Sequence, residues 1–384
     1  MKRPRALFLS PIDMRASNGM SRLQQQLLSA MCSLYDDSVD LLSLGASPGR
    51  AQKWLADSGL NVNVLDGIFP RLAWLNTTLW YGGGAILCNK LRWIDRFYFP
   101  IQTPLPEKCI QNYDVIVCFY PWLHRLLKLE RAGRKVVVDT GDIMADRHER
   151  TGARRWISMT AEDERKVLHS PSRCLAVSRD DADEFERLYG VRLPVQFFVP
   201  PNCEELIALA GKERPKRLGY MGAPSYVNEE VLRQLSHPDF LASVAAAGVE
   251  MVVAGGICDT VDPSVLRSLE AGGARILGRV PSTVEYYRSI GATVNPVGPS
   301  TGVKIKSVET LVAGRSLITT RWGADRDLAA AFPGQVVYID WPMEPRELGE
   351  LCARVTQETV QPGPEAADAY VRRAMQELKE MLQP

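Results

Sequence analysis

The chain of 384 residues is long enough for about two domains, each with a core of its own. Its 46 lysine and arginine residues nearly balance its 45 aspartate and glutamate residues, so the net charge does not indicate a polyanionic partner such as nucleic acid. The eight cysteines stand singly, without a C-x-x-C pair or a His/Cys cluster, which argues against a disulfide framework and a zinc site and favours thiols in a reducing compartment.

The first half of the chain alternates apolar runs with helical patterns. The run at 6–10 is short and is followed by Pro11, so we expect a first strand there and not a signal peptide. No stretch of about 18 uninterrupted apolar residues follows, and we therefore expect no membrane-spanning helix. Alternation of strands and helices predicts a mostly parallel sheet that binds ligands at the carboxyl ends of its strands. The further strands expected in this half are 39–44, 62–65, 115–119, 136–139, 174–178 and 195–199.

Two loops after these strands are candidates for substrate binding. Asn18 and Gly19 follow the first strand and would let the backbone come close to a ligand, although a plain turn explains the pair equally well. Asp142 and His148 lie in the polar loop after the strand that ends at Asp139. His148 alone is also compatible with a solvated loop histidine.

The segment 68–108 departs from the alternation because aromatic and basic residues are interleaved in it. A membrane interface suits this composition, since aromatic rings lie at the level of the lipid headgroups and cations meet anionic lipid. Two core helices with an aromatic packing face, separated near residues 82–84, are the alternative. The aromatic and basic residues are Trp74, Trp80, Trp93, Phe97, Tyr98, Phe99, Arg71, Lys90, Arg92 and Arg96.

Two consecutive prolines, Pro200 and Pro201, mark the expected boundary between two domains, because they stiffen a connector. The alternation resumes beyond them. The strands expected there are 218–221, 249–254, 275–280, 292–297, 315–320 and 336–339, and the helices include 229–235, 303–313, 345–356 and 365–382.

The stretch 295–325, NPVGPSTGVKIKSVETLVAGRSLITTRWGAD, carries the strongest functional signal. A buried strand leads through a loop of small residues into a helix, and the free N–H groups and dipole of a helix N-terminus attract anions. Lys304 and Lys306 in the first turn oppose that dipole, so an anionic ligand such as a diphosphate explains them better than helix stability does. Glu309 on the same helix is within reach of a ribose hydroxyl pair. An ordinary α/β crossover with solvated lysines is the alternative.

This stretch resembles the donor-binding motif of retaining GT-B glycosyltransferases of the large family numbered four. In that family two glutamates stand eight residues apart, and an Ala-Gly pair follows the second. Glu309 occupies the second position and is followed by Ala313 and Gly314, whereas Thr301 stands at the first. The resemblance implies an α/β protein of GT-B architecture, with two Rossmann-like domains that face each other across a cleft. The implied limits are 1–200 for an acceptor-binding domain, 201–364 for a nucleotide-sugar-binding domain and 365–384 for a C-terminal helix that crosses back to the first domain.

The resemblance also implies roles for individual residues. Lys304 and Lys306 would neutralise the leaving nucleoside diphosphate, and Glu309 would position the ribose. His124 stands where some relatives place a histidine that faces the acceptor. The donor would further contact Gly222, Arg279, Val280, Ser300, Thr301, Gly302 and Val303, and the acceptor would contact Asn18, Gly19, Asp142 and His148.

The predicted function is transfer of a sugar from a UDP- or GDP-linked donor to a saccharide, lipid-linked or small-molecule acceptor, as in bacterial surface glycan assembly. The resemblance implies retention of the anomeric configuration and no cofactor. We also expect no metal, because the Asp-x-Asp pattern of Asp181 and Asp183 lies inside a helical pattern and is better explained as a solvated face. The expected location is the cytoplasm, peripheral at the inner face of the membrane through 68–108. Two alternatives remain, a nucleotide-sugar epimerase of the same fold and a non-catalytic nucleotide-sugar-binding protein, which Thr301 in place of glutamate favours.

Overall fold

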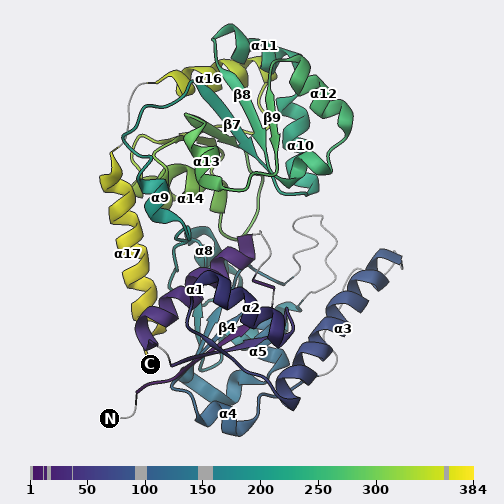
Figure 1. Ribbon diagram of the computed structural model, residues 1–384, viewed down its shortest axis with the longest axis vertical. Coiled ribbons are helices and arrows are strands. Elements are labelled where there is room, and N and C mark those ends of the chain that lie inside the picture. Colours follow the sequence, from purple (N-terminus) through teal and green to yellow (C-terminus); the bar gives the residue numbers. More distant parts are fainter. Residues whose placement is uncertain are drawn as a thin grey trace. The chain divides into compact units, whose positions relative to one another are not determined.

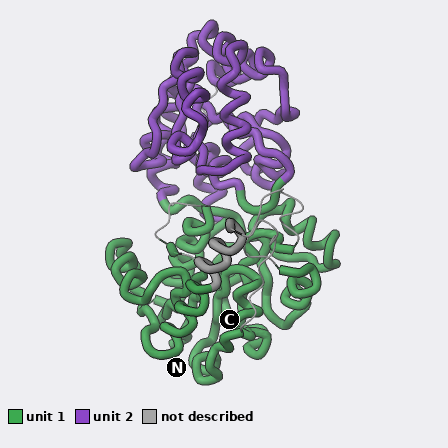
Figure 2. The backbone as a smooth tube through the Cα atoms, turned by 90° about the vertical axis from the view of Figure 1, so that its right-hand side faces the viewer, with its two compact units in different colours: residues 1–201, 300–303, 374–384 green, residues 202–299, 304–373 purple. Residues whose placement is uncertain are grey.

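The computed structural model describes residues 3–11, 13–14, 19–36, 38–90, 102–145, 159–358 and 363–384, with side chains omitted at 80–90. The chain forms two compact units, which Figure 2 shows in different colours. Unit 1 consists of Met1–Pro201, Ser300–Val303 and Ala374–Pro384, and unit 2 consists of Asn202–Pro299 and Lys304–Arg373.

Unit 1 is built on a parallel sheet of six strands in the order β3-β2-β1-β4-β5-β6. Every residue of the four central strands is buried, which explains why these strands are continuous apolar runs rather than alternating ones. The strands are β1 (Ala6–Ser10), β2 (Val39–Ser43), β3 (Asn63–Val64), β4 (Val115–Phe119), β5 (Val136–Asp139) and β6 (Arg173–Leu175).

Helices connect these strands, and Figure 1 shows them on both sides of the sheet. Two of the helices begin at side-chain caps, because the hydroxyls of Thr160 and Ser178 accept hydrogen bonds from the N–H groups of Asp163 and Asp181. The helices are α1 (Gly19–Tyr35), α2 (Pro48–Ser58), α3 (Ile68–Lys90), α4 (Glu107–Gln111), α5 (Pro121–Leu126), the 3-10 helix η1 (Leu129–Lys135), α7 (Ala161–Leu168) and α8 (Arg179–Tyr189).

Unit 2 repeats the same strand order in its own six-stranded parallel sheet, β12-β11-β10-β7-β8-β9. Its core joins residues of the sheet such as Val253 and Ile318 to residues of two covering helices such as Phe240 and Leu348. The strands are β7 (Arg217–Met221), β8 (Glu250–Ala254), β9 (Arg275–Gly278), β10 (Ala292–Asn295), β11 (Ser316–Thr319) and β12 (Val336–Tyr338). The helices are α9 (Cys203–Ile207), α10 (Tyr226–Leu235), α11 (Pro238–Ala246), the 3-10 helix η2 (Gly256–Asp259), α12 (Pro263–Ala271), α13 (Thr283–Arg288), α14 (Ile305–Val312), α15 (Arg326–Ala331) and α16 (Pro345–Gln357). The last helix, α17 (Pro364–Leu382), begins in unit 2 and ends in unit 1.

In each sheet the first strand lies inside, and the strand order reverses beside it. β1 lies between β2 and β4, and β7 lies between β8 and β10. Loops that leave neighbouring strands in opposite directions open a crevice at the carboxyl ends of the strands, where doubly wound sheets bind ligands. The loops after β4 and β10 are therefore the places to look for function.

Two expectations about local structure are wrong. The residues expected to form a strand at 195–199 make only one β-bridge, between Ala176 and Val195. The side chain of Gln26, and not a neighbouring strand, forms hydrogen bonds with the backbone of Phe197 and Val199. Gln26 Nε2 donates to the carbonyl of Phe197, and Gln26 Oε1 accepts from the N–H of Val199. The glycines at 82–84 do not separate two helices, since α3 continues through them. A glycine weakens a helix by about 1 kcal/mol but keeps the N–H group that the helix needs.

Within the described ranges, no helix is long and apolar enough to cross a membrane.

Candidate functional site

The turn from β10 into α14 is built to leave a helix N-terminus open to an anion. Asn295, the last residue of β10, donates from Nδ2 to the hydroxyl of Ser307 at 3.1 Å and so fixes the strand against the first turn of the helix. Lys304 occupies the N-cap position, and a lysine side chain has no acceptor for the N–H groups of that turn. The first turn contains no acidic residue that would compete with a bound anion.

Lys306 brings a cation into the same turn. Its ammonium lies 5.5 Å from the centroid of the Tyr220 ring and 3.4 Å from Oδ1 of Asn228, which belongs to the first turn of α10. Burial lowers the pKa of Lys306 to about 8. The charged form is therefore disfavoured here, and a bound anion would restore it.

Glu309 lies deeper in α14, and its side chain is only 1% exposed. The hydroxyl of Tyr287 donates to Oε2 of Glu309 at 3.2 Å. Tyr287 is fully buried, and its burial and the nearby charge of Glu309 raise the pKa of the Tyr287 phenol. The carboxylate of Glu309 is thus held inside unit 2 by α13. Its contact with a ribose stays a prediction.

The residues 300–303 belong to unit 1 and meet two buried carboxylates there. The hydroxyl of Thr301 donates to Oδ1 of Asp142, and the N–H of Gly302 donates to both carboxylate oxygens of Asp181 at 3.0 and 3.1 Å. Asp142 and Asp181 are each 1% exposed. The structure thereby joins Thr301, expected on the donor side, to Asp142, expected on the acceptor side.

The interpretation of Asp181 as part of a solvated face is wrong. Asp181 is the third residue after the cap Ser178, so it lies in the first turn of α8 and points inward, whereas Asp183 is exposed as expected. The pattern Ser-x-x-Asp at 178–181 signals the start of a helix. It could have placed Asp181 in the first turn of the helix rather than in its middle.

Tyr120 is a residue that the sequence did not single out. It follows β4, and its φ of 77° is positive, which is uncommon for a bulky side chain. Its ring packs against Gly141, where an added Cβ would lie 2.6 Å from Tyr120 Cε1, so that only glycine fits beside it. Backbone strain of this kind gathers at functional sites, and here it lies at the carboxyl edge of the sheet next to Asp142. The aromatic residue directly after a central strand could have drawn attention to this position, but no sequence pattern there requires the positive φ.

Two other titratable groups of unit 1 are buried. Asp139 accepts hydrogen bonds from the N–H of Gly141 at 2.7 Å and from Nε2 of Gln196 at 2.5 Å, and burial raises its pKa to about 7. His124 is 1% exposed and contacts the Ser172 hydroxyl through Nε2 at 3.0 Å. Burial lowers the pKa of His124 to about 4. Its role as an acceptor-facing histidine stays a prediction.

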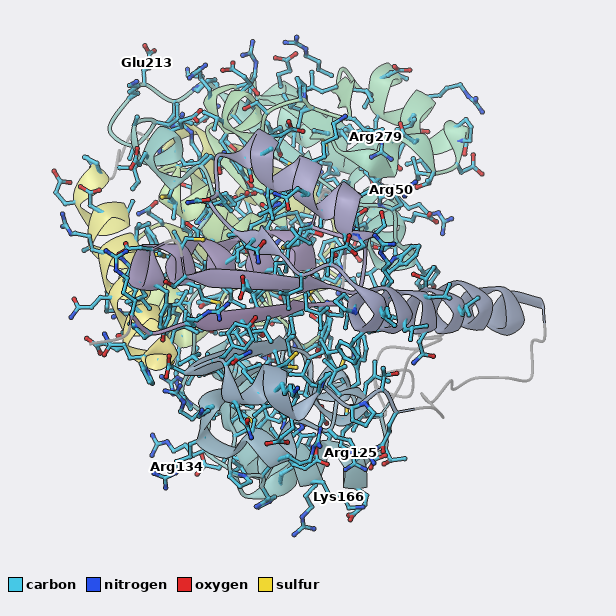
Figure 3. All side chains as sticks on the ribbon, turned by 60° about the horizontal axis from the view of Figure 1, so that its bottom comes forward. Arg50, Arg125, Arg134, Lys166, Glu213 and Arg279 are labelled. Carbon is cyan, nitrogen blue, oxygen red and sulfur yellow. The ribbon has the colours of Figure 1, made fainter. Side chains whose placement is uncertain are left out.

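The remaining predicted donor residues lie in several parts of the chain. Gly222 follows β7, where an added Cβ would lie 2.9 Å from Cγ2 of Ile257. Arg279, labelled in Figure 3, forms an exposed ion pair with Asp259 at 2.6 Å. Val280 lines a cavity of about 180 Å³ on the face of the sheet, Val303 is half-buried, and the hydroxyl of Ser300 has no hydrogen-bond partner among the described residues.

On the predicted acceptor side, Gly19 begins α1 and Asp142 lies after β5. Asn18 and His148 lie outside the described residues, as do Trp93, Phe97, Tyr98, Phe99, Arg92 and Arg96 of the aromatic and basic segment. Throughout the described ranges, no group of three or more His, Cys, Asp or Glu side chains is arranged to hold a metal ion.

Comparison with solved structures places this geometry in a known fold. HepE of Anabaena, in a crystal structure with UDP and glucose, matches 99% of this chain and 97% of its own with a TM-score of 0.58 and 13% identity. A glycosyltransferase from Rickettsia africae matches 100% of this chain and 95% of its own with a TM-score of 0.59 and 11% identity.

WaaG, a glycosyltransferase involved in lipopolysaccharide biosynthesis, matches 98% of this chain and 99% of its own with a TM-score of 0.54 and 13% identity. No family model matches the sequence, and no curated protein matches it either. At these identities the likeness is one of fold, and it agrees with the two six-stranded parallel sheets described above. The chain therefore has the α/β GT-B fold, composed of two Rossmann-like units.

Proposed function

We propose that the protein is a glycosyltransferase that moves a sugar from a nucleotide-sugar donor to an acceptor. The observation that carries the proposal is the first turn of α14, where the pKa of Lys306 is lowered by burial in a turn that has no acidic residue. Desolvation of an ammonium is unfavourable unless an anion lies beside it, and a nucleoside diphosphate would supply that anion. The likeness in fold to HepE, whose crystal structure contains UDP and glucose, supports a nucleotide sugar as the ligand class.

The donor binds to residues 201–364 and the acceptor to residues 1–200, with 365–384 as the C-terminal helix. Lys304 and Lys306 contact the diphosphate of a UDP- or GDP-linked sugar, and Glu309, held by Tyr287, positions the ribose. The other donor contacts are Gly222, Arg279, Val280, Ser300, Thr301, Gly302 and Val303.

The transfer proceeds with retention of the anomeric configuration. The bond between the anomeric carbon and the phosphate oxygen breaks, the acceptor oxygen forms its bond on the same face, and its proton passes to the leaving phosphate oxygen. This route asks the protein for positioning and for stabilisation of the charge on the diphosphate, and the two lysines and the helix N-terminus provide that stabilisation. It needs no metal, so EDTA should leave the rate unchanged.

The acceptor is a saccharide, a lipid-linked sugar or a small molecule, as in the assembly of bacterial surface glycans. Its contacts come from Asn18, Gly19, Asp142 and His148. The protein works in the cytoplasm, peripheral at the inner face of the membrane, with 68–108 as the membrane-contacting segment.

A panel of nucleotide sugars tests the proposal. A donor present at 100 times its dissociation constant should raise the free energy of unfolding by about 2.7 kcal/mol, which thermal shift detects. Addition of acceptor should then release nucleoside diphosphate, and the anomeric coupling constant of the product in proton NMR should show an α-linkage from an α-donor. A β-linked product would contradict retention and would make Asp142 or His148 a candidate base. Donor binding without any transfer would favour a non-catalytic nucleotide-sugar-binding protein, in agreement with Thr301 at the first motif position.

A further inference from the structure

Helix α3 has an unusual distribution of charge. It runs for 23 residues from Ile68 to Lys90, and Arg71 and Lys90 are its charged residues, so the 18 positions from 72 to 89 carry none. A helix on the surface of a water-soluble unit normally carries charged residues along its outer face. Figure 3 shows that α3 extends away from the sheet of unit 1.

The outer face of α3 is apolar. Ile68, Leu72, Leu75 and Leu79 are 83%, 56%, 44% and 63% exposed. Steps of four, three and four residues place them on one side of the helix. They are half of the exposed large hydrophobic side chains in the described part of the chain, and the other four are spread over the two units.

The inner face of α3 holds the helix on unit 1. Ala73 and Thr77 are 2% and 1% exposed, and Nδ2 of Asn76 donates to the hydroxyl of Thr103 at 2.8 Å. At the start of the helix, Arg71 makes two hydrogen bonds of 2.8 Å to the carboxylate of Asp66. The helix is therefore packed through one side, and the apolar stripe faces away from its own unit.

The composition around the stripe fits a lipid surface. Residues 68–108 contain five of the chain's 46 basic residues but only two of its 45 acidic ones, so the segment is cationic although the chain is nearly neutral. The segment also contains three of the eight tryptophans and three of the ten phenylalanines. Apolar side chains on one face, tryptophan and phenylalanine nearby and an excess of cations are the features of helices that lie in the interface of anionic membranes.

A second copy of the chain fits the stripe less well. Its spacing matches a coiled-coil seam, but four positions amount to about two heptads, and stable coiled coils need more. Three glycines at 82–84 then interrupt the seam on the continuing helix.

We propose that α3 lies in the plane of an anionic membrane, with Ile68, Leu72, Leu75 and Leu79 inserted at the boundary between headgroups and acyl chains. This proposal rests on the proposed function in one respect: the protein would bind a membrane because a lipid-linked acceptor lies there. Binding to lipid itself depends on α3 and on the cationic residues of 68–108, and it needs neither donor nor transfer.

Vesicle flotation tests the proposal with the full chain. The parent should bind vesicles of phosphatidylcholine mixed with phosphatidylglycerol and bind pure phosphatidylcholine more weakly. The double variant Leu72→Asn, Leu79→Asn should lose about thirtyfold or more in binding, because the exposed halves of two leucines no longer enter the lipid. Leu188→Asn is the matched control, since Leu188 is 41% exposed on α8, and it should bind like the parent.

Four further results bear on the proposal. Thermal unfolding should be unchanged in the double variant, because both leucines are exposed. Absence of vesicle binding by the parent, or equal binding by the double variant, would overturn the proposal. A parent that is dimeric without lipid and a variant that is monomeric would assign the stripe to a second copy instead. Donor thermal shifts measured on the same variants separate this test from that of the proposed function, since the substitutions should not alter them.

Discussion

Replacement of Lys306 by methionine should stabilise the folded protein while it weakens binding of nucleoside diphosphate. The pKa of Lys306 is about 8, against an ordinary value of 10.5. Each pKa unit corresponds to about 1.4 kcal/mol, so keeping the amine charged at neutral pH costs about 3 kcal/mol. The contacts with Tyr220 and Asn228 offset part of this cost. Methionine has nearly the same length and no charge, and we expect a gain of about 1–3 kcal/mol in the free energy of unfolding.

The size of this stability gain changes with pH in a defined window. Between pH 8 and 10.5 the unfolded chain holds a proton on this lysine that the folded protein has lost, so the stability of the parent rises with pH there. The advantage of the methionine variant should therefore shrink across that window. Below pH 8 both states of the parent are protonated, and the advantage should be constant.

Binding should respond in the opposite direction. Loss of one charge-assisted contact to phosphate costs about 2–3 kcal/mol, which is about 30- to 150-fold in the dissociation constant. In the parent the affinity should fall about tenfold for each pH unit above about 8, because the neutral amine must first take up a proton. The variant should lack this pH dependence.

Calorimetric titration with UDP and with GDP, together with thermal unfolding of the same samples, measures both effects. Lys212→Met is the control, since Lys212 is an exposed lysine of the same unit. If the Lys306 variant binds the diphosphate as tightly as the parent, the diphosphate does not lie at the start of α14. If it unfolds at a lower temperature than the parent, the buried charge does not destabilise the fold.

Two buried carboxylates of unit 1 give further predictions. Asp181→Ala should lower the free energy of unfolding by about 1–3 kcal/mol, because it leaves the buried N–H of Gly302 without an acceptor. Asp183→Ala on the exposed side of the same helix should change it little, and equal effects in chemical denaturation would contradict the reasoning. The pKa of Asp139 is raised to about 7, so the folded protein holds a proton that the unfolded chain has lost between about pH 4 and 7, and stability should fall as pH rises through that range. Asp139→Asn should flatten that part of the pH profile, and a profile like that of the parent would be evidence against a raised pKa.

The sequence predicted the fold better than the polar contacts, for a physical reason. Runs of apolar residues, and apolar residues repeated at helical spacing, indicate which side chains are buried on folding. The strands β1, β4, β5 and β10 were therefore expected close to where they lie. The spacing of apolar residues along a helix does not indicate which group, distant in sequence, a buried polar side chain will hydrogen-bond. Asp181 looked like a solvated residue because its partner, Gly302, is 121 positions away in the chain.

The expected strand at 195–199 failed for the same reason. Gln26 supplies hydrogen bonds that a neighbouring strand would otherwise supply, and it does so from 171 and 173 positions away. The local structure around Lys306 was easier to anticipate, because the strand, the small-residue loop and the start of the helix are contiguous in sequence. The strained backbone of Tyr120 could not be anticipated, since no local pattern requires a positive φ there.

The composition of unit 1 has a consequence for synthesis. Its sheet comes from residues before 202, but unit 1 also includes Ala374–Pro384, which is translated after unit 2. The Tyr35 hydroxyl donates to the carbonyl of Leu382 at 2.8 Å, and Arg173 donates to the carbonyl of Gln383 at 2.6 Å. Unit 1 is therefore started before unit 2 and completed after it, and a nascent chain must leave these hydrogen-bonding groups of unit 1 without their partners while unit 2 is being translated.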